Sequence, residues 1–328
     1  MKRNIILFII LIYSIGIVAA QNEMNKDSLT QELRGYTMRN FTQARTFSLQ
    51  WETRFSHNYS VSNNGSIQES GKKQNIHHIN FSAMLPLLRR NKLSIHIGIN
   101  YKSYNFDLQS QESFHSSFFP QNDYDYFSGN INAAYRTSLW KTPLFLYASV
   151  TTDGWSDGFG KIYGRVAAMM VLKRTEQSRL TVGVMGMTLF RNMPVYPIIT
   201  YWHVFSNSKC SLDITLPSQI FLRYCNRNNR ISVGAAMRGE GFYCKIRSGN
   251  TRYKVCYFTE ATYNPELVYE YIINKHLHLS ISGGYSLLMN SGFYDKDRKN
   301  VKIEGRKIGM KFDRKPTPFF NLNVSYTL

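Results

Sequence analysis

The chain has 328 residues, 40 Lys and Arg against 21 Asp and Glu, a net charge of +19 and a mean hydropathy of −0.32. A basic balance can indicate nucleic-acid binding, but there is no compact Lys/Arg run and the chain begins like an exported protein, so that class is disfavoured. The size excludes the large nutrient transporters that carry an internal plug domain. The remaining oddity is an aromatic-rich composition, with 22 Tyr and 21 Phe, in a chain of negative mean hydropathy.

Residues 1–20 are predicted to be a secretory signal peptide. Two basic residues precede an uncharged apolar stretch at 5–18, and two alanines follow it. This order is typical of a signal peptide cleaved after Ala20. A membrane anchor is the alternative, although the apolar stretch is short for a spanning helix of about 20 residues. We expect residues 21–43 to form a short periplasmic leader, and residues 44–328 to form the main domain.

From residue 44 onward, apolar and polar residues alternate with a period of two, which is the pattern of strands with one apolar face. The segment 93–102, for example, places Leu, Ile, Ile, Ile and Tyr on one face. A tilted strand of about ten residues is long enough to cross a bilayer. Strands are predicted near residues 44–60, 75–87, 92–106, 124–139, 143–152, 162–173, 178–190, 195–205, 258–273, 275–289 and 317–328.

The middle of the chain allows more than one interpretation. Residues 211–225 form either one strand bent at Pro217 or a hairpin that turns at Pro217 and Ser218. The segments Gly239–Gly241 and Ser248–Thr251 are predicted to be further turns. Counting strands in this way gives 14, with 12 and 16 as alternatives.

The connections between strands fall into a short class and a long class. The short ones lie at 88–92, 140–143, 174–178, 226–229 and 274–275, and the long polar ones lie at 61–75, 107–123 and 290–316. Short turns on one side and long loops on the other are typical of barrels in the outer membrane, where the short turns face the periplasm. Because both chain ends are then periplasmic, the strand number is even.

The last ten residues, Phe319–Leu328, alternate strictly between apolar and polar side chains. This segment resembles the closing strand of Gram-negative outer-membrane barrels, which the barrel-assembly machinery recognises. The predicted fold class is therefore all-β, a transmembrane antiparallel β-barrel of about 14 strands that follows a cleaved signal peptide. The expected location is the cell outer membrane.

A resemblance to a family narrows this prediction. The stretches 196–202 (YPIITYW), 211–218 (SLDITLPS) and 221–224 (FLRY) resemble an uncharacterised family of outer-membrane barrels from Gram-negative bacteria. The resemblance is sharpest between residues 195 and 240. It implies a fold and a location, and it implies no particular chemistry.

Basic residues occupy the polar face of several predicted strands, namely Lys102, Arg136, Arg223 and Arg238. A ring of positive charge inside a barrel would attract anions. Alternatively, these side chains pair with Glu52, Asp107, Asp213, Glu266 and Glu270 in a filled interior. Other Lys and Arg in the loops are expected to contact lipopolysaccharide phosphates.

Four cysteines lie at 210, 225, 244 and 256, in spacings that match no metal motif. Cys244 and Cys256 flank the turn predicted at Ser248–Thr251 and would lie opposite one another in a hairpin. They are the candidate disulfide, with unpaired packing as the alternative. No metal site and no cofactor are predicted.

One pattern suggests an enzyme. His278 and Ser280 form an H-x-S arrangement that resembles the catalytic strand of outer-membrane lipid hydrolases, in which histidine activates serine. However, Leu277, Leu279 and Ile281 occupy the lipid-facing positions, so the pair is expected to point inward. We therefore predict no enzymatic activity.

Three functions are compatible with the sequence. The first is a narrow channel or carrier for small solutes, with anionic solutes favoured by a basic lumen. The second is a closed structural or adhesion barrel that contacts lipopolysaccharide or a partner. The third, and remotest, is an envelope lipid hydrolase that uses His278 and Ser280.

Overall fold

The structure is a computed structural model that describes residues 45–328, except 64–65, 74, 107–122, 189–194, 207–208, 249–251, 297, 300–301, 304–305 and 308–309. The predicted signal peptide and leader, residues 1–43, lie outside the described residues. Within the described part, no helix is long and apolar enough to cross a membrane.

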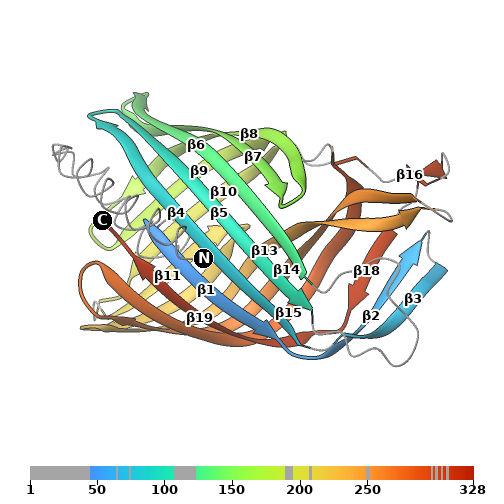
Figure 1. The fold of residues 1–328 in the computed structure, drawn as a ribbon. Helices are drawn as coiled ribbons and strands as arrows, with labels where there is room; N and C mark the ends of the chain where they lie inside the picture. Colours follow the sequence, from blue (N-terminus) through green and yellow to red (C-terminus); the bar gives the residue numbers. More distant parts are fainter. Residues whose placement is uncertain are drawn as a thin grey trace, which may run out of the picture.

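Fourteen antiparallel strands form a closed barrel (Figure 1), which confirms the predicted fold class and strand number. The strands follow one another around the barrel in chain order, and β1 pairs with β19 to close it. Their bounds are β1 Phe47–Arg54, β4 Ile76–Arg90, β5 Leu93–Phe106, β6 Asp123–Leu139, β7 Thr142–Trp155, β8 Gly158–Arg174, β9 Ser178–Met187, β10 Val195–Val204, β11 Cys210–Leu216, β12 Gln219–Asn226, β13 Asn229–Ser248, β14 Arg252–Ile272, β15 Leu277–Asp295 and β19 Thr317–Tyr326.

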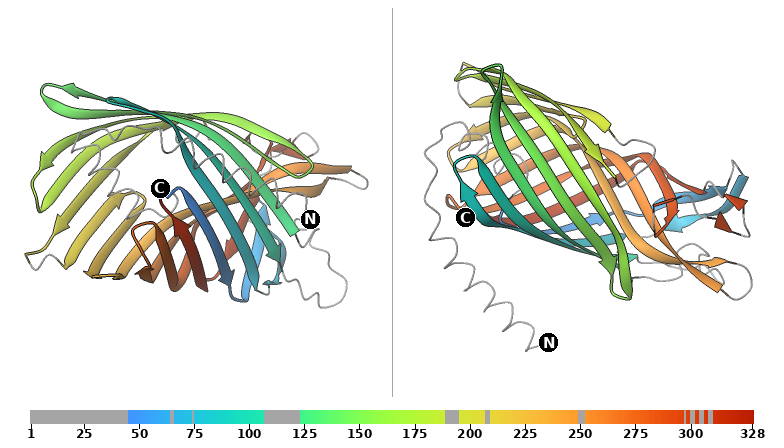
Figure 2. Two further views of the ribbon diagram at one scale, coloured as in Figure 1. Left: turned by 60° about the vertical axis from the view of Figure 1, so that its left-hand side comes forward. Right: turned by 90° about the horizontal axis from the view of Figure 1, so that it is seen from above.

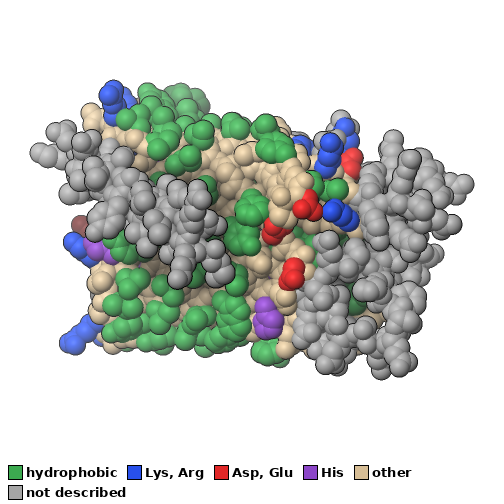
Figure 3. All heavy atoms as spheres, in the orientation of Figure 1, with side chains coloured by type: hydrophobic (Ala, Val, Ile, Leu, Met, Phe, Trp, Pro, Cys, Tyr) green, Lys and Arg blue, Asp and Glu red, His purple; other side chains and the backbone are tan. Residues whose placement is uncertain are grey.

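The two-residue period explains the wall of the barrel. In β19, Phe320, Leu322 and Val324 point outward and are exposed, whereas Asn321 and Asn323 between them are buried. Such a strand places apolar side chains toward lipid and polar ones toward the lumen. Hydrophobic side chains accordingly cover much of the wall in view (Figure 3).

The two ends of the barrel differ. The C-terminus and the short turns after β4, β6, β8, β10, β12 and β14 lie at one end, which we name the turn end. The opposite end, the loop end, carries additional strands inside the long connections (Figures 1 and 2). These are β2 His57–Asn63, β3 Ser66–Lys73 and β18 Met310–Arg314 in one sheet, and β16 Lys302–Ile303 and β17 Arg306–Lys307 in another.

The structure resolves the uncertain middle of the chain. Residues 211–225 form a hairpin of β11 and β12 that turns at Pro217 and Ser218, so the bent-strand alternative was wrong. The turn predicted at Gly239–Gly241 was also wrong, because β13 runs through these residues while paired to β14. The chain does reverse between Ser248 and Arg252, which pair with each other. The long hairpin of β13 and β14, which this continuous strand forms, was therefore not predicted.

Candidate functional site

The hairpin of β13 and β14 rises far above its neighbour at the loop end. Pairing between β12 and β13 stops at Ala236, yet β13 continues to Ser248 with no described strand on its β12 side. Along this extension the in-out alternation disappears: Gly241–Cys244 and Cys256–Phe258 are buried on both faces. Side chains that are buried on both faces cannot form a wall with lipid on one side. This part of the hairpin therefore packs against protein on both sides.

In this extension of the hairpin, which we call the arm, three residues of β13 lie opposite three residues of the same type in β14. Phe242 lies opposite Phe258, Tyr243 opposite Tyr257, and Cys244 opposite Cys256. The Phe and Cys side chains join one aromatic cluster, and the two Tyr side chains join another. We name these six residues, with their backbone, the cover.

One face of the cover packs on the far side of the barrel. The ring of Phe242 lies 5.0 Å from that of Tyr104 in β5 and 4.6 Å from that of Tyr124 in β6 (centroid distances). Phe258 extends the same cluster to Phe293 in β15 and Phe312 in β18. Because β13 and β5 belong to well-separated positions in the strand order, the cover bridges the mouth of the barrel at the loop end.

The other face is held by a buried carboxylate, Asp153 of β7. Its oxygens accept hydrogen bonds from the hydroxyls of Tyr243 at 2.7 Å and Tyr126 at 3.3 Å, and they pair with Arg298. The Arg298 guanidinium also lies over the Tyr257 ring, 3.1 Å from its centroid. Charge-assisted bonds of this kind are stronger than neutral ones, particularly away from water. Asp153 thus connects the wall, the cover and the connection after β15.

Beneath the cover lies a network of charged side chains. Arg54 of β1 pairs with Glu52 at 2.9 Å and also contacts Glu240 and Glu260. Arg238 bridges Glu52 at 2.8 Å and Glu266 at 2.5 Å. The residues of this network are Arg54, Arg238, Arg314, Lys102, Glu52, Glu240, Glu260 and Glu266. We name it the upper network, and its four basic and four acidic groups balance.

A void of about 20 Å³ separates the cover from the upper network, between Phe242 and Phe258 on one side and Arg54 and Glu260 on the other. That volume accommodates about one water molecule. Layers of aromatic rings and paired charges therefore occupy the interior at the loop end.

A second network lies on the same side of the barrel, among β1 and β11–β15. Glu270 pairs at 2.7 Å with Arg45, which lies two residues before β1, and at 2.9 Å with Arg230. Asp213 pairs with Arg223 at 2.8 Å and accepts a hydrogen bond from Gln219 at 2.9 Å.

The four basic residues proposed for a positive lumen have different surroundings. Arg223 pairs with Asp213, and Arg238 pairs with Glu52 and Glu266, which are partners that the filled-interior alternative named. Lys102 is attracted by Glu240 and Glu52. Arg136, near the turn end, is half-buried. Carboxylates form ion pairs with Arg223 and Arg238, two of the four basic residues.

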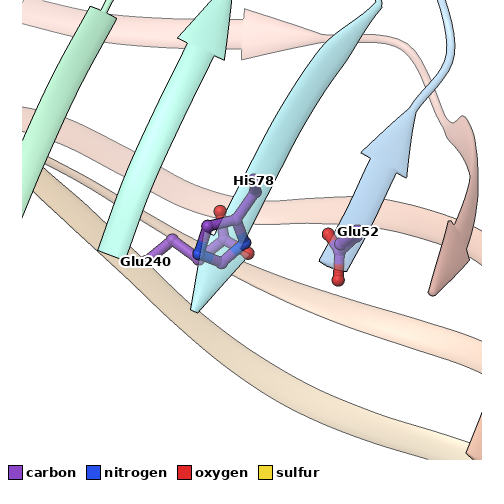
Figure 4. Close-up of side chains that lie close together, drawn as sticks. All are labelled: Glu52, His78 and Glu240. Atoms are coloured by element: carbon purple, nitrogen blue, oxygen red, sulfur yellow. The ribbon is translucent and has the colours of Figure 1, made fainter. Parts of the chain in front are cut away.

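Two carboxylates of the upper network and a neighbouring histidine meet the spacing of a metal site: Glu52 of β1, Glu240 of β13 and His78 of β4 (Figure 4). Their ligand atoms lie within 4.8 Å of one another. However, Arg54 already holds both carboxylates, so a cation would have to enter beside a bound guanidinium. We interpret Glu52 and Glu240 as members of the upper network, and His78 as a side chain that lies beside them.

The H-x-S pair does not form a dyad in the structure. His278 Nδ1 lies 3.7 Å from Glu270, and Ser280 accepts a long hydrogen bond from Asn323 at 3.4 Å. Both side chains belong to the polar inner face, whereas Ile281 beside them is exposed on the wall. Cys244 and Cys256 lie directly opposite one another, as their spacing predicts, and they are thiols in this structure.

A pocket of about 260 Å³ opens beside the cover, at the rim formed by β5 and β6. Its lining includes Asp123 and Asp125 at the start of β6, Trp155 at the end of β7, and Asp157 in the following turn. Lys245, beyond the cover, pairs with Asp157 at 3.0 Å. The pocket offers carboxylates and aromatic rings to a solute that reaches the loop end.

Sequence reasoning missed the cover, although a signal was present. The segments FYC at 242–244 and CYF at 256–258 interrupt the alternation with three consecutive bulky or apolar residues. A strand of the barrel wall alternates apolar and polar residues, so such runs are not expected in it. The mirrored order also indicates a hairpin in which like residues face each other.

A closed antiparallel barrel, apolar outside and polar inside, is the architecture of outer-membrane β-barrel proteins. The chain belongs to the family described as "Domain of unknown function (DUF6268)", which matches residues 55–327. No curated protein matches the sequence.

Several solved barrels are similar at low identity. The COG4313 outer membrane channel from Pseudomonas putida F1 is 8% identical, with 85% of this chain and 96% of that chain covered and a TM-score of 0.34. The toluene transporter TodX from Pseudomonas putida is 11% identical, with 85% and 88% covered and a TM-score of 0.37. The outer membrane protease OmpT from Escherichia coli is 7% identical, with 86% and 96% covered and a TM-score of 0.29.

Proposed function

We propose that the protein is a gated channel or carrier for a small solute in the outer membrane of a Gram-negative bacterium. The observation that carries the proposal is the cover, which is built from a barrel hairpin and closes the mouth at the loop end. A barrel of 14 strands encloses more space than its own wall side chains need. An arm that lies across the mouth and could move would allow the passage of solutes to be regulated.

The way the cover is attached supports gating. On its β15 side the hairpin is continuous with the sheet, since β14 pairs with β15 up to Cys256 and Asp295. Toward β5, β6 and β7, no strand pairing joins β13 to the wall among the described residues, and the contacts are between side chains. Separating the hairpin from β5, β6 and β7 therefore breaks no strand pairing, provided that it stays paired with β15. The aromatic contacts of Phe242 and the bonds of Asp153 are what hold the cover on that side.

The paired charges alter the expected selectivity. A lumen with a net positive ring would favour anions, but carboxylates balance the basic groups of the upper network. We therefore propose that the passage selects by size and by polar contacts rather than by a strong preference for anions.

The test is to remove the cover and measure conductance. Residues 242–258 are replaced by Asn-Gly, which forms a tight turn between the paired residues Gly241 and Thr259. We expect the wild type to be closed for most of the time in planar bilayers and the shortened protein to conduct steadily. The matched control is Lys245→Ala, which removes an exposed ion pair beyond the cover and leaves its six residues in place.

Both proteins must first show the heat-dependent gel migration of a folded barrel. If the folded, shortened protein neither conducts nor admits solutes into liposomes, the gated passage is refuted and a closed structural or adhesion barrel becomes the better account. An ester-hydrolysis assay on the wild type and on His278→Ala tests the remote hydrolase alternative.

A further inference from the structure

Basic side chains surround the turn end of the barrel. Each of the six turns there, or a strand residue next to it, contributes at least one Lys or Arg: Arg89, Arg90, Lys92, Lys141, Lys173, Arg174, Lys209, Arg227 and Lys275. Apart from Arg89, which is half-buried, these residues are exposed. Glu176 is the one acidic residue among the described residues of these turns. We name the nine residues the basic ring.

The loop end has a different charge distribution. Exposed Asp123 and Asp157 lie there together with Lys245 and Lys296. In the face that Figure 3 presents, Lys and Arg appear at both ends, whereas the Asp and Glu in view gather toward the loop end. The two ends therefore differ in their acidic residues: basic and acidic side chains mix at the loop end, whereas the described turns of the turn end are almost purely basic.

The ring lies at the depth where the lipid-facing wall ends. Leu139 and Trp140 are exposed immediately before Lys141, and Trp140 is 83% exposed. Exposed Leu172 likewise precedes Lys173 and Arg174. An apolar side chain followed by an aromatic or basic one marks the boundary between hydrocarbon and headgroups. Long basic side chains at that boundary keep their stems in the apolar layer and their charges among the headgroups.

We propose that the basic ring binds the phosphates of anionic phospholipids in the leaflet that surrounds the turn end, which is the periplasmic leaflet if the proposed location is correct. Each Lys or Arg near an anionic surface strengthens binding by a factor of about five. Nine such residues around one rim make that rim selective for anionic over zwitterionic lipid.

The depth of the ring decides between a lipid and a soluble acidic partner. A protein partner needs basic groups that stand clear of the bilayer, but Lys141, Lys173 and Arg174 follow lipid-facing residues within two positions. Because the turns are short, the ring cannot extend far beyond the headgroups. Lipid phosphate is the anion that is present at this depth.

The experiment uses Trp140 as a local reporter in the full mature chain, with Trp51, Trp155 and Trp202 changed to Phe. The protein is reconstituted into phosphatidylcholine vesicles that contain brominated phosphatidylglycerol or brominated phosphatidylcholine, and quenching gives the relative affinity for the two lipids. We expect several-fold selectivity for phosphatidylglycerol that weakens at high salt, because screening reduces it.

Two triple variants test the assignment. Lys141→Gln, Lys173→Gln and Arg174→Gln neutralise the part of the ring nearest to Trp140, and we expect the selectivity to fall close to one. The matched control neutralises Lys245, Lys296 and Lys299 at the loop end, and it should retain the wild-type value.

Equal quenching by the two lipids in the parent protein, or unchanged selectivity in the ring variant, would overturn the proposal. Gel migration before and after boiling verifies folding in every sample. The measurement requires no conductance, so its failure is distinguishable from failure of the gated passage.

Discussion

Asp153 is the residue on which the closed mouth most depends. It is buried, it accepts hydrogen bonds from two tyrosines and it pairs with Arg298, whose side chain is also buried. Removing one partner of a buried ion pair leaves the other charge uncompensated in a medium that solvates it poorly. The cost is therefore much larger than the value of the contact itself.

We expect Asp153→Asn to destabilise the folded barrel by roughly 3 to 5 kcal/mol and to increase the open time of the proposed passage. Asp157→Asn is the matched control, because Asp157 forms an exposed pair with Lys245, and such pairs contribute about 1 kcal/mol or less. The transition from folded to unfolded gel migration on heating measures stability. Equal effects of the two substitutions would contradict the role assigned to Asp153.

Gly160 shows how closely the cover approaches the wall. The turn after β7 is at Ser156 and Asp157, and Gly160 belongs to β8. A Cβ built on Gly160 would lie 1.8 Å from the Tyr243 hydroxyl and 2.5 Å from an oxygen of Asp153. The position therefore needs glycine because the cover occupies the space of a side chain.

Gly160→Ala should displace Tyr243 and open the mouth more often, whereas Gly164→Ala on the same strand should not. A Cβ on Gly164 finds its nearest neighbour at 3.7 Å, an ordinary contact. Single-channel recordings compare the open probability of the two variants. If both behave like the wild type, Tyr243 does not hold the cover in place.

At the scale of elements, the β13–β14 hairpin combines two kinds of structure in one continuous pair of strands. Up to Glu240 β13 alternates like any wall strand, and at Gly241–Cys244 it is packed on both faces. The mirrored order of Phe, Tyr and Cys places identical side chains opposite each other, which lets the two strands fill each aromatic layer together.

Cys244 and Cys256 lie opposite one another in this hairpin, and we expect them to form a disulfide in the mature protein. The proposed location implies export to a compartment where disulfides form, and the two thiols face each other within the cover. We expect alkylation of unfolded, unreduced protein to label Cys210 and Cys225 and to spare Cys244 and Cys256. Mass spectrometry locates the labels, and Cys244→Ser should make Cys256 reactive. Labelling of all four in the wild type would show that the pair stays reduced.

Alternation along single strands was sufficient to predict the barrel, its strand number and the inward position of His278 and Ser280. The alternation predicts which face of its strand a side chain occupies. It does not predict which side chain on the opposite wall of the lumen it contacts. For that reason the pairing of Arg238 with Glu52, residues from strands far apart in the chain, remained one of two alternatives. The cover was missed because glycines at 239 and 241 resemble a turn, whereas tertiary contacts keep them in a strand.

At the scale of the whole molecule, closure depends on β19, which pairs with β1 on one side and β15 on the other. An open edge in lipid leaves backbone groups without partners, at several kcal/mol each. Deleting Asn321–Leu328 should therefore prevent folding into vesicles, as seen by loss of the heat-dependent gel shift. Deleting only Thr327 and Leu328, which lie beyond β19, is the control. A folded eight-residue truncation would show that closure uses other residues.

Charge balance leads to a second whole-molecule prediction. In the shortened protein, Glu266→Gln removes one carboxylate from the upper network and leaves Arg238 with Glu52 alone. The reversal potential should then shift toward anion preference. Glu176→Gln, in an exposed turn, should change it little. No shift for Glu266→Gln would place the conducting path away from the upper network.

The strand order also has a consequence for how the chain is assembled. Thirteen of the fourteen seams join barrel strands that follow one another in the sequence, and the seam of β1 with β19 joins Phe47 to Tyr326. Hairpins can therefore be added one after another with short loop closures, and a single late event unites the two ends. Until that event every intermediate presents two unpaired edges, and such edges recruit other chains. Because of this topology, the incomplete barrel needs another protein to protect its edges until the last pair of strands has formed.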